Sequence, residues 1–284
     1  MNVPQKLSIG DEIRIVAPSR SASILSEEGI VQAKERLEEL GLKVTFGEHI
    51  FKSDLQNSAS IDHRVADLHA AFTDQNVKGI LTVIGGFNCN ELLPYLDYEL
   101  IKQNPKILCG YSDITALANA ITAKCGFITY SGPHFSSFQM EQAQNYQTAF
   151  FKKCLMQDIP YALQQSEEWS DDAWYLDQDN RLFEPTEWKV YSEGKASGKL
   201  YGGNLCTLNL LQGTQFMPNI EGAILFVEDD ELVFPEMFAR DLTSLLQAVG
   251  SISGLVIGRF QKASNMTEDQ LIFILDKHPQ LKEI

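Results

Sequence analysis

A serine stands where a buried strand is expected to turn into a helix. Residues 106–109, of which 107–109 are apolar, predict a strand, and residues 114–124 predict a helix, so Ser112 lies in the tight turn between them. A serine there can act as a nucleophile, because ligands bind at the carboxyl ends of parallel strands and free N–H groups at a helix N-terminus stabilise an oxyanion. Ile114 replaces the second glycine of the G-x-S-x-G pattern. The alternative is that Ser112 or Asp113 only caps the helix.

Two other strand ends carry groups that could assist such a serine. Gly85 and Gly86 follow the apolar segment 79–84, and glycines let the backbone N–H groups approach a ligand closely. A plain turn is the alternative. Glu228 is the first of four acids after the apolar segment 223–227. A carboxylate at that position can orient a histidine by accepting its second ring N–H, whereas the alternative is a solvated loop.

A serine nucleophile needs a general base, and histidine is the usual one. The chain has five histidines, which are His49, His63, His69, His134 and His278. His134 follows a predicted strand beside that of Ser112, so it is a candidate for the base, for a substrate contact or for a structural role. His278 is expected at a helix end, where it can interact with the helix dipole. No cluster of His, Cys, Asp or Glu has metal-ligand spacing, so we expect neither a metal nor another cofactor.

The predicted elements alternate between short apolar strands and helices, which indicates a mostly parallel sheet in an α/β fold. In the first half, strands are expected at 13–17, 43–46, 79–84, 106–109 and 127–130, with helices at 26–40, 61–72 and 114–124. The acidic stretch 141–180 has no clear period and is expected to hold the domain boundary. Later strands are expected at 223–227 and 254–257, and later helices at 235–249 and 267–277, the last with Thr267 as its N-cap. We divide the chain into domains 1–160 and 191–284, joined by the segment 161–190.

Composition narrows the class of protein. The chain has 284 residues, of which 44% are hydrophobic and 21% charged, so it can bury a core without disulfides. Its net charge of −15 argues against nucleic-acid and anionic-membrane partners, which need clustered Lys and Arg. Five cysteines with no C-x-x-C pair indicate buried, reduced thiols. No signal peptide and no apolar run of membrane-spanning length is present, so we expect a cytoplasmic protein.

Several segments occur in a fixed order and together resemble the LD-carboxypeptidase family of serine peptidases. They are IGGFNCN at 84–90, GYSDITAL at 110–117, YSGP at 130–133, YGGNL at 201–205, LFVED at 225–229 and GLVIGRF at 254–260. The resemblance covers about residues 10–262. The family includes muramoyltetrapeptide carboxypeptidases and microcin C immunity peptidases, and the segment 84–90 is closer to the microcin branch.

The resemblance implies a flavodoxin-like N-terminal domain, a smaller α/β C-terminal domain and a homodimer. It also implies a set of site residues: Ser112 as nucleophile, Glu228 as the carboxylate that orients a histidine, the N–H groups of Gly86 and Asp113 as oxyanion hole, and Asn204 and Trp188 on the substrate side. The family takes its histidine from a Gly-His segment beyond the last strand found here, and no histidine of this chain follows a glycine. We therefore expect the intact protein to continue past Ile284 and to carry that histidine there.

The sequence leaves two classes of function open. The first is a cytoplasmic serine peptidase that hydrolyses an amide of a short peptide, such as a murein tetrapeptide, or of a peptidyl-nucleotide through an acyl-Ser112 intermediate. The second is a non-catalytic module that binds a small ligand or peptide on the same scaffold, which the missing histidine favours. Covalent labelling of Ser112 by a fluorophosphonate distinguishes them.

Overall fold

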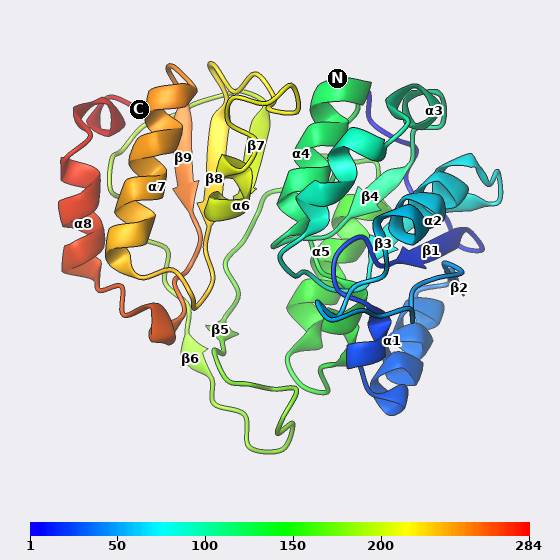
Figure 1. Ribbon diagram of the computed structural model, residues 1–284. Helices are drawn as coiled ribbons and strands as arrows, with labels where there is room; N and C mark the ends of the chain where they lie inside the picture. Colours follow the sequence, from blue (N-terminus) through cyan, green and yellow to red (C-terminus); the bar gives the residue numbers. More distant parts are fainter. The chain divides into compact units, whose positions relative to one another are not determined.

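The computed structural model describes all 284 residues, which form two compact units. Unit 1 consists of Met1–Leu163 and Trp174–Asp179, and unit 2 consists of Gln164–Ala173 and Asn180–Ile284. Each unit has a parallel sheet of its own, as Figure 1 shows, so the two units are described separately.

A four-stranded parallel sheet forms the centre of unit 1, in the order β2-β1-β3-β4. Its strands are β1 (Glu12–Val16), β2 (Lys43–Phe46), β3 (Val77–Thr82) and β4 (Ile107–Cys109). This order is that of the flavodoxin-like fold and confirms the expected fold class. Next to β4, the predicted strand 127–130 is reduced to single bridges, one of which joins Tyr130 to Cys109.

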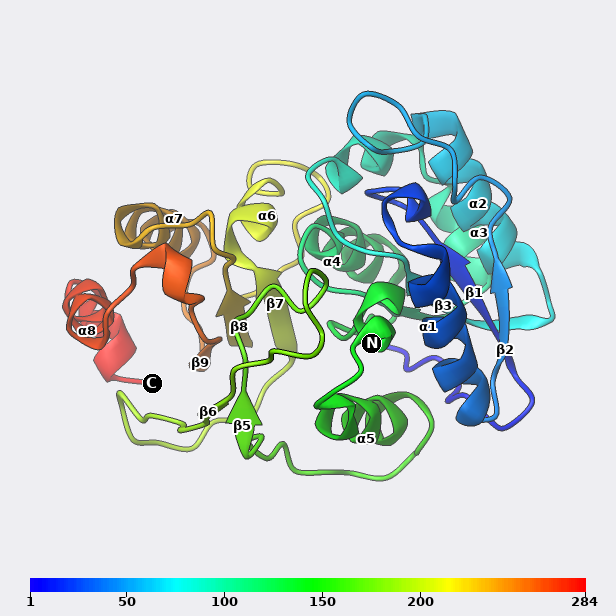
Figure 2. The same cartoon turned by 90° about the horizontal axis from the view of Figure 1, so that it is seen from below.

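Helices cover both faces of this sheet. They are α1 (Glu27–Glu39), α2 (Ile61–Thr73), α3 (Tyr98–Gln103), α4 (Ile114–Cys125) and α5 (Gln144–Leu155), with 3-10 turns at Ala22–Ile24, Cys89–Tyr95 and Phe135–Gln139. Successive strand residues point to opposite faces. Leu81 of β3 therefore packs in one core with Leu37 and Phe151, which come from α1 and α5, whereas Ile80 is buried on the other face. Figure 2 shows α1 and α5 on one side of the sheet and α2 and α3 on the other.

A three-stranded parallel sheet forms the centre of unit 2, in the order β7-β8-β9. The unit contains β7 (Leu200–Asn204), α6 (Leu205–Asn209), β8 (Ile224–Glu228), α7 (Pro235–Ala248), β9 (Gly254–Ile257) and α8 (Glu268–Asp276), with 3-10 turns at Lys262–Ser264 and Pro279–Lys282. A small antiparallel pair, β5 (Glu168–Trp169) and β6 (Glu184–Pro185), precedes them. Thr267 accepts a hydrogen bond from the backbone of Gln270 and caps α8, as predicted.

The stretch 141–180, which shows no clear period, nevertheless contains α5. Only Phe151 and Leu155 of that helix are buried, so its sequence carries little of the apolar periodicity that marks a helix. The division into domains 1–160 and 191–284 stays a prediction. No helix of the structure is both long and apolar enough to cross a membrane.

Candidate active site

Ser112 occupies a strained turn between β4 and α4. Its φ angle is +58°, in the left-handed region that residues other than glycine rarely adopt. The half-buried Ser112 side chain forms no hydrogen bond, while its carbonyl oxygen accepts from the N–H of Thr115 in the first turn of α4. The hydroxyl is therefore held at the carboxyl edge of the sheet with its lone pairs and its proton available.

Glycine is required where β3 ends opposite this turn. A Cβ atom at Gly85 would lie 2.9 Å from both the Cβ and the Oγ atoms of Ser112, which is closer than real Cβ atoms come. The same Cβ would lie 3.6 Å from the N atom of Asp113. The backbone after β3 thus runs directly against the serine hydroxyl and the first amide of the helix.

Two backbone amides beside Ser112 have no acceptor within the chain. The N–H groups of Gly86 and Asp113 form no hydrogen bond, whereas the nearby amides of Asn88 and Ile114 are bonded. Free amides fixed beside a nucleophile can stabilise negative charge that develops on a carbonyl oxygen. This is the arrangement expected of an oxyanion hole, although the roles of these amides stay predictions.

The carboxylate of Asp113 connects three loops at this edge instead of capping α4. Its Oδ2 atom accepts hydrogen bonds from Ser19 Oγ at 2.5 Å, from the Asn88 N–H at 3.0 Å and from the Cys89 N–H at 2.9 Å. Asp113 is the N-cap residue of α4 by position, but its side chain makes no capping hydrogen bond. The buried carboxylate therefore holds the loops after β1 and β3 against the turn of Ser112.

His134 lies beneath the turn and is almost completely buried, with 1% of its surface exposed. Its Nδ1 atom is 2.7 Å from Thr82 Oγ1, and its ring stacks on Tyr111 with 4.3 Å between centroids. Burial lowers the pKa of His134 to about 3, and a backbone hydrogen bond with Tyr111 opposes this only in part. A ring with this pKa is a weak base, and a buried ring has no surface for a substrate. The substrate-side role predicted for His134 therefore gives way to the structural one.

The other histidines are also engaged elsewhere. In unit 1, His49 stacks on His63 and bonds to Asp67, and His69 accepts from the Asp97 N–H. No group of three or more His, Cys, Asp or Glu residues is placed to hold a metal ion.

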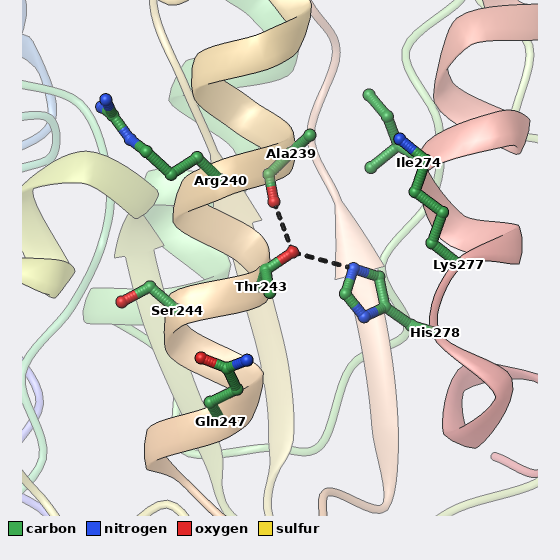
Figure 3. Close-up of a pocket in the computed structure, with 8 residues that line it drawn as sticks. All are labelled: Ala239, Arg240, Thr243, Ser244, Gln247, Ile274, Lys277 and His278. Carbon is green, nitrogen blue, oxygen red and sulfur yellow. Dashed lines mark hydrogen bonds between the residues drawn. The ribbon is translucent and has the colours of Figure 1, made fainter.

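His278, the histidine of unit 2, lies in a pocket of about 370 Å³ between α7 and α8. Its Nε2 atom is 3.2 Å from Thr243 Oγ1. Figure 3 draws this contact and the hydrogen bond from Thr243 to Ala239. Thr243 donates its own proton to the carbonyl of Ala239, so the histidine nitrogen is the donor. None of the eight residues around the pocket is a predicted site residue.

In unit 2, Glu228 and Asn204 are direct neighbours on adjacent strands, β8 and β7. The side chain of Asn204 caps α6 by accepting from the Thr207 N–H, and it also hydrogen-bonds to Glu228. The Oε1 atom of Glu228 is buried with no partner. Burial and the nearby Asp230 raise the pKa of Glu228 to about 7, although the hydrogen bond from Asn204 opposes them. This carboxylate has a free acceptor atom of the kind that a histidine N–H would use.

Asp229 is a buried acid that the sequence does not distinguish from its neighbours. It is 3% exposed, and burial raises its pKa to about 7. One oxygen accepts from the Cys206 N–H at 3.4 Å and the other has no partner. Nearly complete burial separates Asp229 from Asp230, which is half-buried, and from Glu231, which is exposed.

The three tryptophans differ in whether a neighbouring side chain covers the indole ring. Trp188 is 59% exposed, so its ring is available to a ligand, and the substrate-side role predicted for it stays a prediction. The ring of Trp169 is covered by Arg259, whose guanidinium carbon lies 4.2 Å from its centroid. Trp174 packs edge-on against Tyr175.

A flavodoxin-like sheet with a strained serine at its carboxyl edge defines a class of α/β serine hydrolase. Comparison with known proteins makes this specific: the LD-carboxypeptidase N-terminal domain matches residues 13–132, and the LD-carboxypeptidase C-terminal domain matches residues 197–284. The chain therefore belongs to the LD-carboxypeptidase family and is a serine-type carboxypeptidase. Family membership favours an enzyme over the non-catalytic module.

Relatives cover most of the chain. YocD from Bacillus subtilis (strain 168) is 54% identical over 282 residues, which are 98% of this chain and 87% of YocD. The crystal structure of an MccF-like protein from Bacillus anthracis str. Ames matches all of this chain and 88% of its own, at 50% identity and a TM-score of 0.98. The microcin C7 self-immunity protein MccF, in complex with aspartyl sulfamoyl adenosine, matches at 29% identity and a TM-score of 0.87, over 97% of this chain and 87% of its own. A murein tetrapeptide carboxypeptidase from Pseudomonas aeruginosa is 25% identical over 88% of this chain and 75% of its own.

Proposed function

We propose that Ser112 is the nucleophile of this carboxypeptidase. The observation that carries the proposal is the turn itself: a serine at φ +58° with an unbonded hydroxyl, packed against Gly85 and beside the unbonded amides of Gly86 and Asp113. Backbone strain of this kind costs about 1 to 3 kcal/mol and persists where function requires the conformation. The proposed partner is Glu228, which orients a histidine that serves as general base; none of the five histidines of the chain hydrogen-bonds to Glu228 in the structure.

The chemistry follows from these roles. The Oγ atom of Ser112 attacks the scissile carbonyl carbon while the histidine takes the hydroxyl proton. The N–H groups of Gly86 and Asp113 receive the oxyanion. When the C–N bond breaks, the histidine gives its proton to the leaving amine, and water then hydrolyses the acyl-Ser112 ester. Glu228 accepts the second ring N–H of the histidine and stabilises its positive charge.

We propose a murein tetrapeptide or a peptidyl-nucleotide as the substrate. The printed names of the relatives support both, since one is a murein tetrapeptide carboxypeptidase and another binds aspartyl sulfamoyl adenosine. Asn204 and Trp188 are the proposed substrate contacts in unit 2.

We further propose that the protein is a cytoplasmic homodimer. Sedimentation velocity at micromolar concentration tests the dimer, and cell fractionation tests the location.

The decisive experiment compares Ser112→Ala with Ser197→Ala, a matched change at an exposed serine. We expect Ser112→Ala to lose at least about 1,000-fold in kcat on both substrate types, because the nucleophile is gone. It should also lose labelling by a fluorophosphonate while it still binds the substrate. The Ser197→Ala variant should behave as the parent protein does. Labelling and cleavage that survive in Ser112→Ala would exclude Ser112 as the nucleophile.

A further inference from the structure

Arg20 is fixed beside the predicted oxyanion hole by its own backbone. It follows β1, at the same edge of the sheet as Ser112, and its N–H donates to the carbonyl of Gly85 at 3.4 Å. The next residue, Ser21, is held by two hydrogen bonds, from its N–H to the Asn57 carbonyl and from its hydroxyl to the Ile50 carbonyl. The backbone of Arg20 therefore has little freedom to move away from the glycines.

The side chain of Arg20 starts directly against Gly86. A Cβ atom at Gly86 would lie 3.0 Å from the Cγ atom of Arg20 and 3.3 Å from its N atom. Further out, the guanidinium carbon lies 5.3 Å from the centroid of the Phe87 ring, in a cation–π contact. Phe87 is 65% exposed, so this contact lies at the surface, and a guanidinium keeps five N–H donors for hydrogen bonds.

Arg20 differs from the other arginines of unit 1 in having no acceptor. Arg14 forms ion pairs with Glu12 and Asp74. Arg36 donates hydrogen bonds to the carbonyl oxygens of Phe138 and Met140. Arg64 forms an ion pair with Glu91 and donates to the carbonyl oxygens of Pro18 and Asn88. The guanidinium of Arg20 makes no hydrogen bond or ion pair. In a chain of net charge −15, a half-buried guanidinium without an acid is an uncommon feature. Its place beside Gly86 indicates that its acceptor belongs to a ligand.

The reaction requires such an acceptor. A carboxypeptidase cleaves the amide next to a C-terminal residue, so the carboxylate oxygens that carry the negative charge lie three bonds beyond the scissile nitrogen. An acylated sulfamoyl adenosine likewise carries an ionised group next to its scissile carbonyl. When the carbonyl oxygen is bound at the amide of Gly86, either anion lies within a few ångströms, which is inside the reach of the arginine stem. A guanidinium binds such anions with paired, charge-assisted hydrogen bonds.

We propose that Arg20, steadied by Phe87, is the residue that binds the anionic group on the leaving side of the scissile bond. This proposal rests on the proposed function, because it takes Gly86 as part of the oxyanion hole. It makes Arg20 the determinant of carboxypeptidase specificity: peptides that end in a free carboxylate are cleaved faster than those that end in an amide.

The test measures kcat/KM for a murein tetrapeptide and for the same peptide with a C-terminal amide. We expect Arg20→Gln to lower kcat/KM for the acid by roughly 10- to 100-fold, mainly through KM, since hydrogen bonds to charged groups are worth this much. The amide should be nearly unaffected, so the acid-to-amide ratio falls towards one. Arg20→Lys should recover part of the loss in kcat/KM, because an ammonium group keeps the positive charge but cannot form the paired hydrogen bonds of a planar guanidinium. Phe87→Leu should also lower kcat/KM for the acid and not for the amide, but by a smaller factor than Arg20→Gln.

Controls separate this proposal from the proposed function. Lys43→Gln removes one exposed positive charge at the amino end of β2 and should leave the ratio unchanged. A neutral sulfonyl fluoride should label Ser112 equally in the parent protein and in Arg20→Gln, which also shows that the variant is folded. Loss of labelling in Ser112→Ala, together with an unchanged acid-to-amide ratio and no loss on aspartyl sulfamoyl adenosine in Arg20→Gln, would leave Ser112 in place and overturn the role of Arg20.

A second pair of assays identifies the source of the anion. Aspartyl sulfamoyl adenosine replaces the peptide, and Arg20→Gln is compared with the parent protein on both. A loss on the peptide acid alone assigns the anion to the C-terminal carboxylate, and a loss on the nucleotide compound alone assigns it to the sulfamoyl group. A loss on both supports a common anion site. An equal effect on the acid and the amide peptide, with no loss on the nucleotide compound, would overturn the proposal.

Discussion

The buried carboxylate of Glu228 predicts a variant that is more stable and less active than the parent protein. Burial and Asp230 raise the pKa of Glu228 from its ordinary 4.5 to about 7. The folded protein therefore holds a proton that the unfolded chain releases, and stability is lost as pH rises from about 4.5 to about 7. Each tenfold change in proton affinity is worth about 1.4 kcal/mol, so the charged form costs about 3 kcal/mol above pH 7. Glu228→Gln removes that cost and keeps the size of the side chain.

The assay is urea unfolding of both proteins at pH 5 and at pH 8, followed by tryptophan fluorescence. We expect the free energy of unfolding of Glu228→Gln to exceed that of the parent protein by about 2 kcal/mol more at pH 8 than at pH 5. Hydrolysis of the peptide substrate should fall by at least about 100-fold, because the histidine loses its orienting carboxylate. Glu221→Gln, at an exposed acid three residues before β8, is the matched control. If Glu228→Gln exceeds the parent protein in free energy of unfolding by the same amount at pH 5 and at pH 8, burial does not raise the pKa of Glu228 and the reasoning is refuted.

Three further predictions concern the turn of Ser112. Gly85→Ala should lower kcat/KM by about 100-fold, because the new methyl group lies 2.9 Å from the hydroxyl oxygen, and an unchanged rate in the peptide assay would contradict this. Ser112→Gly should be more stable than Ser112→Ala by about 1 kcal/mol in thermal unfolding, because only glycine adopts φ +58° without strain. Asp113→Ala should lower the free energy of unfolding in urea by about 3 kcal/mol, because two buried amides, those of Asn88 and Cys89, lose their acceptor. A loss below about 1 kcal/mol would argue that those amides find water.

The parts of the fold with strong local signals were predictable from the sequence. Continuous apolar runs such as 79–84 identify buried parallel strands, and Gly110 and Gly126 mark the ends of a strand and a helix around Ser112. The strand–turn–helix around Ser112 could be predicted because all of its determinants lie within about 20 residues. The helix α5 could not, since too few of its residues are buried to produce a period.

The interactions that build the candidate site depend on contacts between distant residues, and these were not predictable. Asp113 bonds to Ser19, which is 94 residues away, and His134 bonds to Thr82, which is 52 residues away. Composition and spacing say nothing about either pair. Arg20 stands in no recognisable motif, and its lack of an acceptor is apparent only when the partners of every other arginine in unit 1 are known.

The carboxylate of Asp113 has a consequence for protein engineering. Because one acid joins the loop of Ser19, the loop of Asn88 and its own turn, the three segments form a single exchangeable part. Swapping only one of these loops between family members would leave hydrogen-bonding groups from one parent facing the wrong backbone of the other. Chimeras intended to change substrate preference should therefore transfer all three segments together.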